Sequence, residues 1–562
     1  MVKNKETFTI TAALPYANGP IHIGHLAGVY IPADIYARYK RLTDNEVAFI
    51  CGSDEHGVAI SLASKKASIS PKELIDKYDT IIKSSFKEFG ISFDNYSRTS
   101  KKIHHETSLE LFNALKDKNL FSLKKSKQFY DTKENQFLAD RYISGDCPIC
   151  NAKDAYGDQC EKCGSTLSPE ELKNPKSTIS DSSPVLKETK HYYIKLNEFE
   201  EFLRNWITVE NKDIWKANVI GQVKSWLDSG LKPRAVTRDL DWGIPVKVDG
   251  DDGKVLYVWF EAPIGYISST KEWAQNNNKD WEHYWKNPKT NLIHFIGKDN
   301  IVFHCIIFPI MLKMFGDFIL PKNVPANEFL NLEGDKISTS RNWAVWLHEY
   351  LIEFPDMQDV LRYVLTATCP ETKDNDFTWK EFQTRNNSEL VAIYGNFTNR
   401  VLSLIDKYYG GKIPNPMAVD ESDNEILKEV VFLKNDMESN LNEFKFREAL
   451  KNLIGIARIG NKHLADNEPW KIKSENPERV EQILKTSFEI VTYLAVLSEP
   501  FLPFTSQKLK KMIGINKTRW SNLNNLASEI NFNFIITNKE MLFRRIEDSE
   551  IEFQIDKLKK NL

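Results

Sequence analysis

Two histidines close to the N-terminus are the first side chains whose spacing indicates chemistry. His22 and His25 lie three residues apart, where a predicted strand, 8–13, and a turn rich in proline and glycine lead into a helix that starts near Pro20. At that spacing both imidazoles project from one helix face, and Gly24 between them lets a ligand approach the backbone. A helix N-terminus is a natural site for phosphate. The stretch therefore predicts a phosphate site, with two structural histidines as the alternative.

A carboxylate follows the second predicted strand. Strand 46–50 leads into the polar loop 51–57, which contains Asp54. In α/β sheets, ligands bind beyond the carboxyl ends of the strands. Asp54 is therefore a candidate to bind the amino group of a ligand, and capping of the next helix is an equally simple role for it.

Four of the seven cysteines have the paired spacing of a zinc knuckle. Cys147-x2-Cys150 and Cys160-x2-Cys163 are separated by nine residues. Four thiolates close a tetrahedral zinc shell and leave no position for a substrate, so we expect one structural Zn²⁺, with four unligated cysteines as the alternative. The other three cysteines are scattered, which favours a metal site in a reducing cytoplasm over a disulfide framework.

The elements that must position these residues alternate between apolar strands and helices from 7 to about 100, as in a parallel sheet with crossover helices. Pro32, inside the first helix, predicts a kink or a second helix start there. The alternation lapses between about 120 and 233, around the cysteines. It resumes with predicted parallel strands at 255–260 and 292–296. We therefore expect one α/β domain that is split by an insertion.

From about residue 386 the pattern is helical. Apolar residues at steps of three and four form two stripes, and such stripes predict an antiparallel helix bundle. The stripes are Leu390, Ile393, Phe397, Val401, Leu404 and Tyr408, and then Ile426, Val430, Leu433, Met437, Leu441 and Phe444.

Three polar or aromatic residues of this helical region could meet RNA. Asn396 and Arg400 lie beside the first stripe, and Trp470 follows Pro469. Unstacked RNA bases are bound by aromatic faces and polar edges. The alternative is that Asn396 and Arg400 are an ordinary pair on a helix surface and that Trp470 packs against other side chains.

The composition is that of a globular protein with several domains. The chain has 562 residues, of which 41% are hydrophobic and 27% charged, which predicts about three to five domains. A net charge of -3 argues against a uniformly basic surface but leaves room for local RNA-binding faces. The N-terminus lacks a targeting pattern, and the most apolar run, 301–315, is too short to span a bilayer. We expect a cytoplasmic protein without membrane contact.

Four segments together resemble one protein family. The string 13–25, ALPYANGPIHIGH, resembles the HIGH signature of class I aminoacyl-tRNA synthetases in the form found in the methionyl-tRNA synthetase family. Segment 257–266, YVWFEAPIGY, is similar to the family's YVWxDAPIGY, 297–299 to its GKD, and 336–340, KISTS, to its KMSKS loop. The cysteine spacing is similar to that in the connective insertion of one zinc-containing group of the family. The resemblance covers nearly the whole chain.

The resemblance implies a role for each segment. The implied catalytic residues, which stabilise charge on the phosphates, are His22, His25 and Lys336. The implied ATP-binding residues are His22, Gly24, His25, Gly297, Asp299, Lys336, Ser338 and Thr339. The implied methionine-binding residues are Ala13, Leu14, Tyr16, Asp54, Val258, Trp259, Ala262, Pro263, Tyr266, His304 and Phe308, and the implied anticodon-binding residues are Asn396, Arg400 and Trp470.

Four positions depart from the family pattern. Glu261 stands where aspartate is common, Asn300 where an aliphatic residue is common, Phe308 where tryptophan is common, and Thr339 where the second lysine of KMSKS is expected. The last change removes a positive charge near the ATP phosphates, and Arg341 is a candidate to compensate for it.

The implied architecture is a split Rossmann-type catalytic domain with a zinc-containing connective insertion, followed by an all-α anticodon-binding helix bundle. Its implied parts are the first catalytic half, 1–119, the insertion with the zinc knuckle, 120–232, the second half, 233–325, the KMSKS-like loop with a stem-contact region, 326–385, and the anticodon-binding domain, 386–562.

The implied reaction is the activation of L-methionine with ATP to methionyl-adenylate and pyrophosphate, followed by transfer of methionine to the terminal adenosine of tRNA(Met), elongator and initiator. Mg²⁺ is expected with ATP. There are three alternatives. Another class I synthetase would need a longer editing insertion than the ~110 residues available. A nucleotidylyltransferase that does not act on tRNA would leave the helical region without a role, and the third alternative is a catalytically inactive RNA-binding paralogue. A monomer is expected, because no strand-rich dimerisation module follows the bundle.

Overall fold

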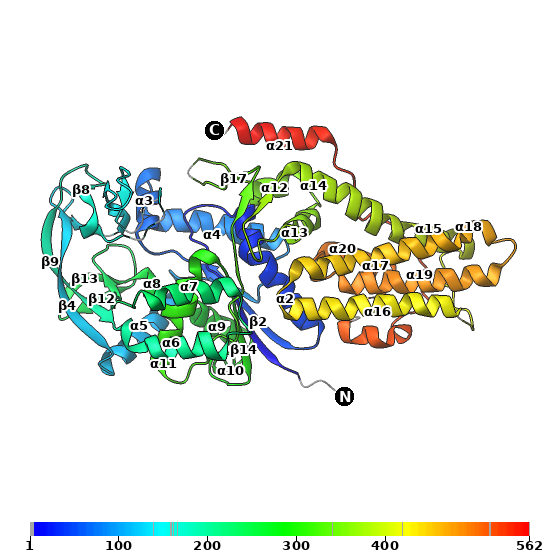
Figure 1. Ribbon diagram of the computed structural model, residues 1–562, viewed down its shortest axis with the longest axis horizontal. Helices are drawn as coiled ribbons and strands as arrows, with labels where there is room; N and C mark the ends of the chain where they lie inside the picture. The colour runs from blue at the N-terminus through cyan, green and yellow to red at the C-terminus, as the bar shows by residue number, and fades with distance from the viewer. Residues whose placement is uncertain are drawn as a thin grey trace.

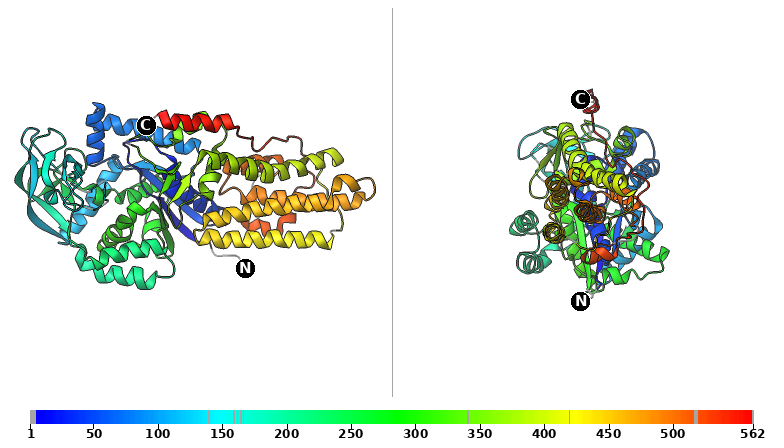
Figure 2. Two further views of the ribbon diagram at one scale, coloured as in Figure 1. Left: turned by 45° about the horizontal axis from the view of Figure 1, so that its top comes forward. Right: turned by 90° about the vertical axis from the view of Figure 1, so that its right-hand side faces the viewer.

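The computed structural model describes residues 5–138, 140–157, 160, 162–163, 165, 167–339, 341–418, 420–515 and 519–560. Ser340, the last residue of KISTS, lies outside this set. The molecule is elongated, with a parallel sheet near its middle, the strands of the insertion at one end and long helices at the other (Figure 1). Figure 2 shows the same arrangement from two further sides.

The central sheet joins the two halves of the split domain. Its strands are parallel, in the order β15-β14-β1-β2-β3. β1 (Thr7–Ala12) therefore lies between β2 (Glu46–Ser53) of the first half and β14 (Thr290–Gly297) of the second, with β3 (Asn95–Arg98) and β15 (Ala326–Asn327) at the edges. Most side chains of the three inner strands are buried, as expected when helices cover both faces. The predicted split α/β domain is confirmed.

The helix after β1 starts later than its sequence indicates. It begins with α1 (Ile23–His25), rather than near Pro20, and continues through a π-helical turn (Leu26–Tyr30) into α2 (Ile31–Leu42). His22 caps this helix with its own side chain. A ring nitrogen at the N-cap position satisfies amide groups that a helix leaves without partners.

Pro32 produces the π-helical turn rather than a break. Proline has no N–H to donate to the carbonyl of Gly28, four residues earlier. That carbonyl instead accepts a hydrogen bond of 3.0 Å from Nδ2 of Asn327. π-turns of this kind are common beside functional sites.

The insertion consists of antiparallel sheets. β4 (Phe121–Asp131) pairs with β9 (Val185–Ile194), and β5 (Gln136–Phe137) and β10 (Arg234–Ala235) complete a four-stranded sheet. A separate small sheet has the strand order β7-β6-β8, with β6 (Ile143–Asp146), β7 (Ala155–Tyr156) and β8 (Lys173–Ser177), and the cysteine pairs lie in the loops that connect these strands. The predicted insertion between the halves is confirmed.

The predicted parallel strand at 255–260 is wrong. The chain leaves the small antiparallel strand β13 (Asp251–Leu256) and turns into a four-residue helix, α8 (Val258–Glu261). A strand would place Phe260 and Glu261 on opposite faces. The helical turn allows both to be buried while Trp259 faces the ligand cavity, so tertiary packing overrides the β-propensity of this aromatic run.

The C-terminal region is the predicted helix bundle. Its long helices are α15 (Asn396–Tyr409), α16 (Glu421–Asn442), α17 (Phe446–Asn467) and α19 (Pro477–Leu497), which extend side by side in Figure 1. Leu390, Phe397, Val401, Val430, Met437, Leu441 and Phe444 of the two predicted stripes are buried in its core. Among the described residues, no helix combines the length and apolar composition needed to cross a bilayer.

The last helix returns from the bundle to the catalytic part. α21 (Asp548–Lys560) lies over α12 (Leu347–Glu353), as Figure 1 shows. Nζ of Lys557 lies 2.6 Å from a carboxylate oxygen of Glu349 and 2.6 Å from one of Glu353.

Candidate functional site

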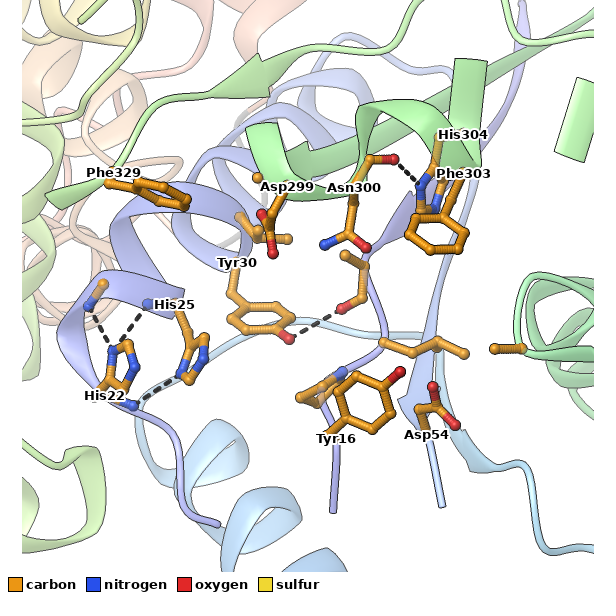
Figure 3. Close-up of a pocket in the computed structure, with 18 of the residues that line it drawn as sticks. Tyr16, His22, His25, Tyr30, Asp54, Asp299, Asn300, Phe303, His304 and Phe329 are labelled. Carbon is orange, nitrogen blue, oxygen red and sulfur yellow. Dashed lines mark hydrogen bonds between the residues drawn. The ribbon is translucent and has the colours of Figure 1, made fainter. Parts of the chain in front are cut away.

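A cavity of about 470 Å³ opens where the carboxyl ends of β1 and β14 meet α1 and α8. Its lining comes from both halves of the split domain and from the segment 328–337. Figure 3 shows His22 and His25 at one end of the cavity and Phe303 and His304 at the other. This position is the one expected for a ligand of a parallel α/β sheet.

The two histidines are neutral hydrogen-bond donors. Nδ1 of His22 accepts the backbone N–H groups of Gly24 (3.1 Å) and His25 (3.4 Å), and Nδ1 of His25 accepts the N–H of His22 (3.2 Å). A ring nitrogen that accepts carries no proton, so each ring keeps its proton on Nε2. Burial lowers the pKa of His25 to about 4, and burial together with His25 lowers the pKa of His22. The stacked rings, 3.6 Å apart, thus present two N–H groups at a helix N-terminus.

The KISTS segment packs against this helix. Lys336, in the short strand β17 (Asp335–Lys336), lines the cavity and is exposed. A Cβ at Gly24 would lie 3.0 Å from the side chains of both His22 and Ile337, so a larger residue would force the loop and the helix slightly apart. Ser338 exchanges two backbone hydrogen bonds with Trp343, of 3.0 and 2.9 Å. These contacts place the amino group of Lys336 on the same cavity as the histidine pair.

A second glycine shapes the opposite rim. A Cβ on Gly297 would lie 2.6 Å from Oδ1 of Asp299, so the carboxylate folds against the backbone only because Gly297 lacks a side chain. Burial raises the pKa of Asp299. In Figure 3 Asp299 lies between Phe329 and Asn300, close to the ring of Tyr30, and the hydroxyl of Tyr30 donates to the carbonyl of Ala13 (2.9 Å).

The other end of the cavity suits an apolar, polarizable group. Phe303 meets the Trp259 ring edge-on at 4.5 Å. Nδ1 of His304 donates to the carbonyl of Asn300 (3.0 Å), which leaves Nε2 to accept from the hydroxyl of Tyr266 (2.8 Å). Burial lowers the pKa of His304 to about 4, so this histidine is uncharged. Aromatic edges and an uncharged imidazole are favourable surroundings for a thioether.

Asp54 is a buried carboxylate that faces this end of the cavity. It does not cap the next helix, α3 (Val58–Ala67), whose N-cap is Gly57, so the capping alternative is wrong. Among the described residues no lysine or arginine forms an ion pair with it, and its Oδ1 lies 3.5 Å from the N–H of His56. Burial and the nearby charge of Glu261 raise the pKa of Asp54. A ligand's ammonium group would supply the missing positive partner.

Glu261 is buried behind the cavity wall that Asp54 and Trp259 help to form. Its two carboxylate oxygens lie 3.1 Å from Nδ1 of His56 and 2.6 Å from Nε2 of His104. Burial alone would raise the pKa of Glu261, but the two histidines lower it to about 2. The carboxylate thus fixes α8, and with it Trp259, to the loop after β2 and to α5 (Lys102–Asp117).

The structure gathers most of the predicted ligand residues in one cavity. Ala13, Leu14, Tyr16, His22, Gly24, His25, Asp54, Val258, Trp259, Ala262, Pro263, Tyr266, Gly297, Asp299, His304 and Lys336 line it. Ser338 and Thr339 do not line it, and Phe308 lies behind the wall, with its ring centre 6.2 Å from that of Tyr266. The predicted contacts of these three residues with ATP or methionine stay predictions.

Sequence reasoning missed several lining residues. They are Pro15, Gly28, Val29, Tyr30, Asn300, Phe303, Glu328, Phe329, Leu330, Asn331 and Ile337. Tyr30 and Phe303 lie on π-helical turns, which direct side chains differently from an α-helix. Pro15, within the string 13–25, Asn300, directly after the GKD segment, and Ile337, within the KISTS segment, lie in or beside motifs that could have pointed to them.

The four predicted metal ligands meet at one point. The sulfur atoms of Cys147, Cys150, Cys160 and Cys163 all lie within 4.8 Å of one another. Cys147 and Cys163 are 3.9 Å apart and Cys150 and Cys160 3.7 Å. Four sulfurs at ~2.3 Å from a tetrahedral zinc ion are separated by about 3.8 Å. The four cysteines are therefore placed to hold a metal ion, and none of them forms a disulfide.

The three predicted RNA-binding residues also lie together. The guanidinium carbon of Arg400 is 4.9 Å from the ring centre of Trp470, which is 38% exposed. Asn396, one turn earlier on α15, is exposed and lies 3.5 Å from the side chain of Asn461. Arg400 and Trp470 form one face near the far end of the bundle, where Figure 1 shows α18 (Pro469–Ile472). RNA binding by the three residues stays a prediction, and the alternative of a helix-surface pair with a packed tryptophan stays open.

Comparisons with known proteins agree with this geometry. A family model described as "tRNA synthetases class I (M)" matches residues 8–402, and one described as "Anticodon binding domain of methionyl tRNA ligase" matches residues 413–559. The methionine–tRNA ligase of Flavobacterium johnsoniae is 59% identical over 99% of this chain and 82% of its own length, and that of Bacteroides fragilis is 60% identical over 99% and 81%. A Mycobacterium tuberculosis methionyl-tRNA synthetase in complex with methionyl-adenylate has a similar fold, with a TM-score of 0.79 at 23% identity over 96% of this chain and 100% of that chain. The chain therefore belongs to the methionyl-tRNA ligase family of class I tRNA synthetases.

Proposed function

We propose that the cavity activates L-methionine with ATP to form methionyl-adenylate and pyrophosphate, and that the chain then transfers methionine to the terminal adenosine of tRNA(Met). The observation that carries this proposal is the polarity of the cavity. One end offers two imidazole N–H groups and Lys336, and the other offers an aromatic pocket beside the unpaired carboxylate of Asp54. Methionyl-adenylate has matching chemistry: a phosphate, an ammonium group and a thioether.

The first step needs positioning more than acid or base catalysis. The methionine carboxylate is already a nucleophile, and its oxygen attacks the α-phosphorus of ATP as the bond to pyrophosphate breaks. We assign the N–H groups of His22 and His25 and the ammonium of Lys336 to the charge that develops on the phosphates. Asp54 binds the substrate ammonium, and Trp259 and His304 bind the side chain. Mg²⁺ would enter on the phosphates of ATP.

Methionine-dependent exchange of labelled pyrophosphate into ATP, followed by charging of tRNA(Met), tests the proposal. We expect both activities, and we expect methionine to be preferred over leucine, isoleucine and valine, because the pocket end is aromatic rather than aliphatic. Exchange with one of those amino acids in place of methionine would favour another class I synthetase. Pyrophosphate exchange without tRNA charging would favour a nucleotidylyltransferase. Binding of tRNA without any pyrophosphate exchange would favour a catalytically inactive paralogue.

The same proposal assigns the anticodon to Asn396, Arg400 and Trp470. The Arg400→Ala and Trp470→Ala variants should each lower kcat/KM for tRNA(Met) charging by about 10- to 100-fold, because a base loses its stacking surface or its polar contact. Pyrophosphate exchange should not change, since the trio lies on the bundle. The control is Lys471→Ala, which removes an exposed cation paired with Glu468 in the same short helix, α18 (Pro469–Ile472). Equal charging by all variants would contradict the assignment.

We further propose that the four cysteines hold one structural Zn²⁺. Elemental analysis should find one zinc per chain in the purified protein and less than half of that in the Cys150→Ser variant, because three thiolates bind zinc far more weakly than four. Cys305→Ser, a change at a buried cysteine outside the cluster, should keep the metal. A full zinc content in Cys150→Ser would show that the cluster is not the metal site.

The finer assignments follow from the same proposal. The parts 1–119 and 233–325 activate methionine, 120–232 carries the zinc knuckle, 326–385 contacts the tRNA stem, and 386–562 reads the anticodon. The chain acts in the cytoplasm as a monomer and charges both elongator and initiator tRNA(Met).

A further inference from the structure

A side chain of the insertion sheet packs against the outside of the wall at the methionine end of the cavity. Arg234 lies at the start of β10, just beyond the boundary at residue 232 that the sequence indicates for the insertion, but the pairing of β10 with β9 makes it part of the insertion sheet. Its guanidinium carbon lies 4.1 Å from the ring centre of Trp259 and 5.5 Å from that of Trp226. Arg234 therefore connects a tryptophan of the insertion helix α7 (Ala217–Asp228) to the tryptophan of the cavity wall.

The orientation of the Trp259 ring depends on contacts with residues outside its own helix. It lies on α8, a helix of only four residues, and its ring is half-buried. Within the catalytic half it meets Phe303 edge-on at 4.5 Å and stacks on Tyr257 at 5.6 Å. The guanidinium of Arg234 adds a planar, weakly hydrated cation to an indole ring, which is the most favourable aromatic partner for it.

We propose that Arg234 is a positioning residue for methionine binding. It holds the Trp259 ring in the orientation that closes the pocket, so that methionine enters a preformed site rather than one that must be ordered on binding. Arg234 does not line the cavity, and its effect is transmitted through Trp259. Because Arg234 is held in the insertion sheet by the pairing of β10 with β9, this contact links the insertion to the methionine end of the cavity.

Steady-state pyrophosphate exchange on the full chain tests this inference, which rests on the proposed methionine activation. The Arg234→Ala variant should raise the KM for methionine by about three- to ten-fold, leave the KM for ATP unchanged, and alter kcat less than two-fold. Arg234→Lys keeps a cation over the indole but loses the planar stack, so its KM should lie between those of the wild type and Arg234→Ala. Trp226→Ala should change the methionine KM in the same direction by a smaller factor.

The matched control is Arg204→Ala, which removes an exposed arginine of the insertion that pairs with Asp228. Its kinetic constants should equal those of the wild type. An unchanged methionine KM in Arg234→Ala, or a parallel rise of the methionine and ATP constants, would overturn the inference. If the wild type itself shows no methionine-dependent exchange, the proposed function fails instead, so the two failures are distinguishable.

Discussion

The His22→Ala variant is expected to slow methionine-dependent pyrophosphate exchange by about 10²- to 10³-fold, with little change in the KM for methionine. A single preorganised donor to a developing oxyanion contributes a factor of this size. Here the donor is the Nε2–H of His22, whose tautomer is set by the amides of Gly24 and His25 that Nδ1 accepts. The methionine end of the cavity is formed by other residues and stays intact.

A second variant separates this donor role from helix capping. His22→Asn keeps an acceptor that can cap the amides of α1, since asparagine is among the best N-cap residues, but its amide group is too short to reach the position of Nε2. We expect it to lose as much activity as His22→Ala. Recovery of the rate in His22→Asn would show that His22 acts only as a cap. His283→Ala, at a half-buried histidine of α10 (Glu282–Trp285) outside the cavity, should keep full activity.

His22 and His25 should remain neutral hydrogen-bond donors when the pH falls from 8 to 6. Burial lowers the pKa of His25 to about 4 and also lowers that of His22, so both rings stay neutral as the pH falls from 8 to 6. The unfolded chain binds protons on these rings near pH 6.5, which means that their contribution to folding stability is full above that pH and is lost as the pH falls toward 4.

Arg362→Ala should lower the free energy of unfolding by about 3–5 kcal/mol, the usual consequence of removing one partner from a buried ion pair. Arg362, on α13 (Gln358–Ala367), and Asp34, on α2, are both fully buried, and Nη2 of Arg362 donates to Oδ2 of Asp34 at 2.7 Å. The same guanidinium donates to the carbonyls of Pro500 and Phe501, each at 3.0 Å. The variant leaves a buried carboxylate and two carbonyls with fewer donors.

The charge of Asp34 makes the effect large. Burial alone would raise the pKa of Asp34, but Arg38, Arg362 and Ser92 lower it to about 2, so the carboxylate is ionised at neutral pH. Urea unfolding followed by circular dichroism measures the loss. The matched control is Arg385→Ala on the surface of α14 (Trp379–Arg385), which breaks pairs with Glu381 and Glu389 and should change stability by less than about 1 kcal/mol. Similar losses in the two variants would contradict the prediction.

The sequence predicted the parts of the site in which chemistry restricts the residue. His22 and His25 were found because phosphate needs donors at fixed spacings, and the four cysteines because zinc needs four thiolates. Lys336 was predicted only from the resemblance of the segment 336–340 to the KMSKS loop. The three inner strands of the central sheet, β1, β2 and β14, were found from their apolar runs, since strands covered on both faces have little alternation. The short edge strands β3 and β15 were not predicted.

The rest of the site depends on long-range packing that no local pattern encodes. The run 255–260 has the composition of a strand, yet the burial of Glu261 between His56 and His104 requires a helical turn. Phe308 has the size of a pocket residue but lies one layer behind the cavity, while Phe303, one turn earlier, lines it. Arg234 meets Trp259 only because the insertion sheet ends beside α8.

Thr339 is the loop residue that departs most from the family pattern, and its place in the structure limits the effect of this change on the cavity. Thr339, in place of the second lysine of KMSKS, lies outside the cavity wall, whereas Lys336 lines it. Arg341, two residues further on, is exposed and lies in the same turn of the loop. The charge of the loop at the cavity is therefore that of Lys336.

The strand order of the central sheet also affects how the chain is made. β1 leaves the ribosome early, but its partner β14 begins only at Thr290. At ~5–20 residues per second, the strands of the first half wait roughly 10–40 s for the second half, with one edge of β1 open to any other extended chain. The whole insertion is translated within this interval and thus delays completion of the sheet. Before β14 emerges, the nascent chain is most vulnerable to misassembly or most dependent on a chaperone.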